Sequence, residues 1–111
     1  MRFETVKIGC KKGEVTCNKP RVQLYWETGP DSVEWVVQHA PKGALAEIVW
    51  EGKSPFHKVD AKTSRGRLSA SENRKVKGEF KYTIRFTDEE GKLIGELDPM
   101  VANDPCPPVV P

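Results

Sequence analysis

Short runs of alternating apolar and polar residues recur along the chain, and each predicts a β-strand with one buried face. The clearest run is residues 79–87, in which Phe80, Tyr82, Ile84 and Phe86 share one parity and charged or threonine residues share the other. Side chains alternate between the two faces of a strand. The run is therefore typical of an antiparallel sheet that packs on one side only.

Further runs of this kind follow one another at intervals of about eight to twelve residues, with turn residues between them, which is the pattern of a β-sandwich or barrel. No segment has an apolar period of 3.6 residues over a long stretch, so no long helix is expected. Residues 71–76 are polar and predict a loop or a single helical turn. The expected strands are centred on residues 6–10, 22–26, 33–37, 44–51, 56–61, 67–70 and 93–97.

Two strand pairings can be predicted from parity. A loop at 27–32 would join the strands at 22–26 and 33–37 as a hairpin, with Leu24 opposite Trp35. A loop at 88–91 would join residues 79–87 to 93–97, with Phe86 opposite Leu93 and Ile84 opposite Gly95. Gly95 would leave room for a bulky neighbour or mark a bulge.

These elements predict an all-β fold, an antiparallel β-sandwich of about seven to nine strands. The sandwich is expected to occupy residues 1–102 as one domain. Residues 103–111 contain four prolines, at positions 105, 107, 108 and 111, and predict an extended C-terminal tail on the surface or a disordered one.

The segment from Gly78 to Lys92 resembles the last hairpin of immunoglobulin-like domains of the fibronectin-III and PKD type, with Phe80 and Tyr82 in the aromatic positions. Trp35 is similar to the core tryptophan of an immunoglobulin-like third strand. Ile84 stands where antibody-type domains have a cysteine, so the resemblance does not bring their inter-sheet disulfide. This architecture carries many functions and implies none of them by itself.

The same strand rhythm is also similar to that of cupredoxins, whose late strand reads Gly-x-Tyr-x-Tyr. Their copper site needs a cysteine with a histidine soon after it and a second histidine earlier in the chain. Here Cys106 is followed only by proline and valine, and the two histidines are His39 and His57. The resemblance therefore implies the cupredoxin-like shape without a blue-copper site.

Composition narrows the possible functions only slightly. The formal net charge is +2, from 18 basic and 16 acidic residues, which indicates no obligatory nucleic-acid or membrane partner. No apolar run is long enough for a transmembrane helix, and the first residues lack the apolar core of a signal peptide. We expect a cytoplasmic protein if Met1 is native; otherwise the compartment stays open.

Cys10 and Cys17 flank a possible two-residue turn at Gly13-Glu14, which would place them directly opposite each other, at a distance that a disulfide can span. The alternative is two small core thiols. A bridge from Cys17 to Cys106 is a third possibility that spacing does not decide. The cysteines and histidines show no metal-ligand spacing, so no metal or other cofactor is expected.

The charges are unevenly distributed. The segment 58–81 has eight basic and three acidic residues, which we interpret as solvated faces or as a surface for an anionic partner. No aromatic residues are interleaved in its basic loops at 62–67 and 73–77 for base stacking, so nucleic acid is not the expected partner. The residues of this predicted patch are Lys62, Arg65, Arg67, Arg74, Lys75 and Lys77.

No catalytic constellation is visible, because neither His39 nor His57 has a nearby arrangement of aspartate or serine that would suggest catalysis. The sequence therefore favours a non-catalytic module, a monomer or weak dimer that presents a sheet edge or a loop end to a protein partner. The alternative is a metal-binding or redox protein of cupredoxin-like shape.

Overall fold

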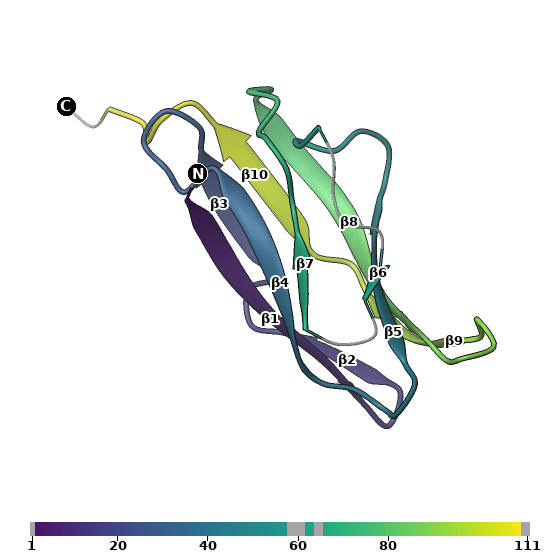
Figure 1. Ribbon diagram of the computed structural model, residues 1–111. Helices are drawn as coiled ribbons and strands as arrows, with labels where there is room; N and C mark the ends of the chain where they lie inside the picture. The colour runs from purple at the N-terminus through teal and green to yellow at the C-terminus, as the bar shows by residue number, and fades with distance from the viewer. Residues whose placement is uncertain (1, 58–61, 64–65, 110–111) are drawn as a thin grey trace.

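Two β-sheets pack face to face in the computed structural model, which describes residues 2–57, 62–63 and 66–109 (Figure 1). The first sheet has the order β2-β1-β4-β7, and the second has the order β3-β10-β8-β5-β6, with β9 also paired to β8. The all-β sandwich predicted from the sequence is confirmed. Within the described residues, no helix is long and apolar enough to cross a membrane.

The first sheet contains β1 (Phe3–Lys11), β2 (Glu14–Cys17), β4 (Ser32–His39) and β7 (Arg67–Ser69). The second contains β3 (Arg21–Tyr25), β5 (Leu45–Trp50), β6 (Lys62–Thr63), β8 (Gly78–Thr87), β9 (Leu93–Leu97) and β10 (Met100–Asp104). The two-residue strand β6 brings the number of strands in the described part of the chain to ten.

The sheets are mixed rather than purely antiparallel. β1 runs parallel to β4, and β3 runs parallel to β10. The predicted hairpin between residues 22–26 and 33–37 is wrong, because β3 and β4 lie in different sheets. Alternation identifies the face that each strand turns to the core, but two strands with the same alternation can face each other across the core as well as pair side by side.

The core lies between the sheets and includes Trp35, Tyr82 and Phe86, all essentially inaccessible to solvent. The indole Nε1 of Trp35 donates a hydrogen bond of 3.1 Å to the hydroxyl of Tyr82, and the two rings meet edge to face at 5.6 Å. This bond satisfies the one polar group that Trp35 brings into the core. The prediction that Trp35 is a core tryptophan is confirmed.

The predicted alternation of β8 is confirmed from Tyr82 onward, because Tyr82, Ile84 and Phe86 are buried while the intervening side chains are partly exposed. Phe80, expected on the same buried face, is only half-buried and lines a surface hollow. The predicted register of its hairpin is wrong by two residues, since Ile84 pairs with Leu97 and Phe86 with Gly95. The Asp88 carboxylate accepts hydrogen bonds from the main-chain N–H groups of residues 90 and 92, and a bulge follows in β9. A shift by two preserves parity, so the apolar pattern does not distinguish the two registers.

Gly95 is required by close packing. A Cβ on this residue would run into the carbonyl oxygen of Gly13 in the β1–β2 turn and would lie 3.1 Å from a methyl group of Val15. The β8–β9 hairpin is therefore packed tightly against the β1–β2 hairpin of the other sheet.

Asn103 and Asp104, which the sequence analysis assigned to the tail, belong to β10, and Asn103 is completely buried. The amides of Asn73 and Asn103 hydrogen-bond to each other at 2.8 and 2.9 Å. Asn103 also donates to the carbonyl of Val76, and Asn73 donates to the carbonyl of Asp31. The network fixes the segment between β7 and β8 as a loop without a helical turn.

The weak strand predicted at 56–61 is reduced to one bridge between Phe56 and Asn73, and residues 58–61 lie outside the described residues. The strands predicted at 44–51 and 67–70 correspond to β5 and β7.

Candidate functional site

The His39 side chain lines three hollows on the surface of the described part of the chain. Its position in the sequence shares the parity of Trp35 and Val37, which predicts a side chain at the rim of the inner face. A bulge in the β1–β4 pairing changes this: Ile8 pairs with Val37, but Gly9 pairs with His39, so Gln38 is the extra residue. Bulges turn a side chain toward the other face of the sheet.

The imidazole ring of His39 lies where a side chain on Gly9 would be. A Cβ on Gly9 would be 2.5 Å from Cε1 and 2.6 Å from Nε2 of His39, closer than any ordinary contact. Gly9 is consequently buried, although its neighbours Lys7 and Lys11 on the same face of β1 are exposed. The glycine is therefore what allows the ring to lie flat on the outer face of the first sheet.

Three surface hollows meet at the His39 ring, with volumes of about 770, 460 and 260 Å³. The largest extends along the β4–β5 connection to Gly43 and Glu89, the second extends to the β1–β2 turn, and the third to Thr16 on β2. The turn and the connection lie together at the end of the sandwich opposite the two chain termini (Figure 1). We call this region the His39 end.

The charged side chains that line the His39 end are mainly basic. Its four lysines come from β1, the β1–β2 turn and the β4–β5 connection, and they are Lys7, Lys11, Lys12 and Lys42. All four are exposed and form no ion pair with any described residue. The backbone φ angles of Lys12 and Gly13 are both positive, 52° and 79°, which makes a tight primed hairpin turn. The turn presents the neighbouring lysines Lys11 and Lys12 to solvent.

One carboxylate, that of Glu89, also lines the His39 end. Its side chain packs so closely over Gly43 that a Cβ on Gly43 would collide with it, and Gly43 has a φ of 79°. The β8–β9 loop and the β4–β5 connection are thus held together at the edge of the largest hollow.

The predicted opposition of Cys10 and Cys17 is wrong. The turn falls at Lys12-Gly13, so Cys10 pairs with Val15, and Cys17 pairs with Ile8. Both thiols are free, as is that of the exposed Cys106. Burial raises the pKa of the Cys10 and Cys17 thiols above their ordinary value, and a main-chain hydrogen bond opposes the shift in each case.

The residues of the predicted basic patch are spread over two parts of the structure. Arg67 lies on β7, 3.6 Å from the carboxylate of Glu34, and Lys62 lies in β6. Arg65 lies outside the described residues.

The other three members of that patch lie in the segment before β8. Arg74 donates a hydrogen bond to the carbonyl of Ser54, and Lys77 lies 4.0 Å from Asp104. Lys75 has a positive φ of 59°, held by a hydrogen bond from its N–H to Asn73.

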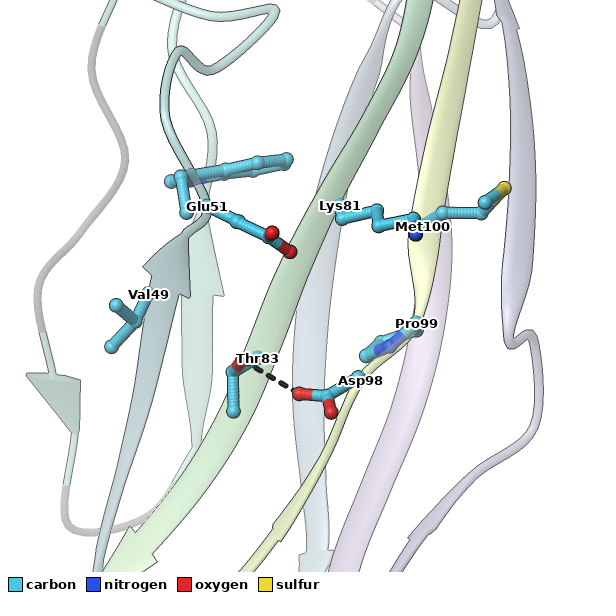
Figure 2. Close-up of a pocket in the computed structure, with 8 residues that line it drawn as sticks. Val49, Glu51, Lys81, Thr83, Asp98, Pro99 and Met100 are labelled. Atoms are coloured by element: carbon cyan, nitrogen blue, oxygen red, sulfur yellow. Dashed lines mark hydrogen bonds between the residues drawn. The ribbon is translucent and has the colours of Figure 1, made fainter.

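Another hollow, of about 520 Å³, lies on the outer face of the second sheet (Figure 2). It forms where β8 exchanges one neighbour for another, because β10 pairs with residues 78–81 and β9 with residues 84–87. Thr83 donates a hydrogen bond of 2.7 Å to Asp98 at this point. Its charged lining is mixed, consisting of Glu51, Lys81 and Asp98, so it has no strong preference for ligand charge.

Comparison of the sequence with protein-family models and with curated proteins finds no match. Among the described residues, no three His, Cys, Asp or Glu side chains converge as a metal site would require.

No sequence motif identifies the His39 end. Its lysines are separated by up to 35 positions, from Lys7 to Lys42, and only the Lys11-Lys12-Gly13 turn is visible as a local signal.

Proposed function

We propose that this protein is a non-catalytic interaction module and that the His39 end binds an acidic segment of a protein partner. The observation that carries the proposal is that four unpaired lysines and one carboxylate line three hollows that share His39. Exposed cations without a local counter-ion attract anionic groups and accelerate encounter with them.

The shape of the site supports a polypeptide segment rather than a small anion. The hollows are open and share the His39 ring, and the basic side chains come from three backbone segments, β1, the β1–β2 turn and the β4–β5 connection. Alanine and proline side chains at positions 40 and 41 provide apolar surface between the charges. An extended segment with spaced Asp or Glu residues can contact several lysines together.

The expected affinity is modest. An exposed ion pair contributes about 0.2–1 kcal/mol, so four lysines together supply on the order of 1–4 kcal/mol. Apolar contacts with Pro41 and the His39 ring must supply the rest. We therefore expect dissociation constants of about 10 μM to 1 mM at physiological salt.

The proposal is tested by titrating the protein with a fluorescent peptide of alternating Glu and Ser, with a Lys–Ser peptide as the charge control. Lys12→Glu and Lys42→Glu each reverse one charge at the His39 end. Lys53→Glu is the matched control, because it makes the same change in net charge beside a hollow on the outer face of the second sheet.

We expect Lys12→Glu and Lys42→Glu to weaken binding of the acidic peptide about five-fold or more each, and Lys53→Glu to have a much smaller effect. Equal effects of all three variants would show that only net charge matters and would contradict a site at His39. Tighter binding of a single-stranded oligonucleotide than of the acidic peptide would also contradict the proposal.

The strand pairing supports the cupredoxin-like shape over the immunoglobulin-like one. Immunoglobulin constant-type domains pair their strands as antiparallel ABED and CFG sheets, whereas this chain has parallel pairs at β1–β4 and β3–β10. We infer a cupredoxin-like module without the copper ligands. Elemental analysis of the purified protein tests this directly, since stoichiometric copper or zinc would overturn a purely interaction-based role.

A further inference from the structure

Strand β3 forms an open edge of the second sheet, because β10 is its only partner strand in the described part of the chain. The carbonyl of Pro20 accepts a hydrogen bond from Met100, and the N–H of Trp26 donates to Asp104. Main-chain groups alternate in direction along a strand. The N–H and C=O groups of Arg21 and Gln23 therefore point away from β10.

The open part of this edge has a defined length. Tyr25 also points away from β10, but its N–H donates to Pro30 and its carbonyl accepts from Gly29. Only Arg21 and Gln23 remain available for pairing with another strand. Unpaired edges of this kind are templates for strand addition.

The corresponding edge of β1 carries an obstacle that β3 lacks. At this edge the main-chain N–H of Lys7 donates to the Asn18 side chain, and its carbonyl accepts from the Asn18 N–H. Only the main-chain groups of Phe3 and Thr5 therefore remain open for pairing along this edge. An antiparallel pairing of two β1 edges through these residues would place Glu4 opposite Glu4 of the other copy, and like charges in opposed positions are destabilising. Glu4 also forms an ion pair with Lys19 across this edge.

We propose that a second copy of this chain docks on β3, in an antiparallel two-fold contact centred on Val22. In this register Arg21 of each copy pairs with Gln23 of the other, and all the free main-chain groups of both edges form hydrogen bonds. Moving the axis to Arg21 would oppose two arginines, and moving it to Gln23 would require the occupied groups of Tyr25. One register therefore satisfies both charge and hydrogen bonding.

The contact joins two six-stranded sheets into one and uses only a few residues of each edge. Small interfaces of this kind associate weakly, so we expect a monomer at about 10 μM and a substantial fraction of dimer at about 1 mM. The inference does not depend on the proposed function, because β3 is not part of the His39 end. A failure of the dimer contact would not affect the proposed binding of an acidic segment, and the reverse also holds.

The experiment is sedimentation velocity over that concentration range. Gln23→Lys places a cation opposite Arg21 of the other copy twice, by symmetry, and is expected to weaken the dimer about three- to ten-fold. Adding Arg21→Glu to Gln23→Lys replaces each repulsive pair with an attractive one and is expected to restore the dimer. Thermal unfolding of each variant confirms that the monomer is folded.

Phe3→Lys is the matched control, because it adds a charge to the other open edge and is expected to leave the dimer unchanged. Restoration by the charge-swapped double variant supports the proposed pairing. A chain that stays monomeric at about 1 mM, a dimer insensitive to Gln23→Lys, or a dimer weakened equally by Phe3→Lys would each overturn it.

Discussion

Replacing Asn103 by alanine removes the buried amide that fixes β10 to the segment before β8. The side chain is completely buried and takes part in three hydrogen bonds: it accepts one from Asn73 at 2.8 Å and donates to Asn73 at 2.9 Å and to the carbonyl of Val76 at 3.0 Å. Each such bond contributes about 1 kcal/mol net. We therefore expect the free energy of unfolding to fall by about 3 kcal/mol, a large part of the stability of a domain this size.

A double-mutant cycle separates the paired amides from their surroundings. Asn73 makes four hydrogen bonds, of which two are shared with Asn103. Removing Asn73 alone should cost about 4 kcal/mol, but the double variant loses only five distinct bonds and should cost about 5 kcal/mol. The two single changes would sum to about 7 kcal/mol, so the coupling energy should be about 2 kcal/mol.

The assay is equilibrium unfolding in urea followed by tryptophan fluorescence, to which the buried Trp35 contributes together with Trp26 and Trp50. The midpoint should move while the slope with urea stays constant, because the surface exposed on unfolding hardly changes. A loss below about 1 kcal/mol for Asn103→Ala would refute the reasoning, since it would mean that water replaces the amide at little cost. Strictly additive effects of the two changes would refute it as well, since they would mean that the two amides are not coupled.

Three further predictions follow from the same structure. Gly9→Ala should displace the His39 ring and lower the affinity for the acidic peptide, at a modest cost in stability. This cost should disappear in a His39→Ala background, and its persistence there would contradict the packing of the ring on Gly9. In the native protein without reductant, iodoacetamide should modify the exposed Cys106 first, Cys17 later and Cys10 only on unfolding. Because burial raises the pKa of Cys17, the rate at which it is modified should climb with pH through the alkaline range. Burial raises the pKa of Tyr82, so above pH ~10 the unfolded state loses its proton first and stability should fall by about 1.4 kcal/mol per pH unit from this group, a fall that Tyr82→Phe should abolish in urea titrations at alkaline pH.

Sequence patterns predict the parts of this fold that depend on burial alone. Three of the four large apolar residues of β8 expected in the core from their parity are there, Tyr82, Ile84 and Phe86, and so is Trp35, whereas Phe80 is only half-buried. The hairpin register depends instead on how Asp88 caps its loop, a contact that leaves no trace in the apolar pattern. The apolar pattern also does not show which sheet a strand joins, because β3 and β4 have equivalent alternation and lie in opposite sheets.

The candidate site likewise depends on features that the apolar pattern does not determine. A single extra residue in β4 moves His39 from its expected face to the position over Gly9, and no local signal in the sequence indicates that bulge. The buried pairing of Asn73 with Asn103 was also unpredictable, since polar residues beside prolines are ordinarily exposed. Both features depend on contacts between segments about 30 residues apart, which are defined only once the sheets have formed.

The central claim, that the His39 end binds an acidic segment, is tested most directly by mapping chemical shifts in isotope-labelled protein during titration with the Glu–Ser peptide. We predict that the largest changes fall on the His39 imidazole, the Lys11–Gly13 turn and the Pro41–Gly43 connection, and that added salt reverses them. Changes concentrated at Glu51, Lys81 and Asp98 on the outer face of the second sheet, or no changes at millimolar peptide, would contradict the claim.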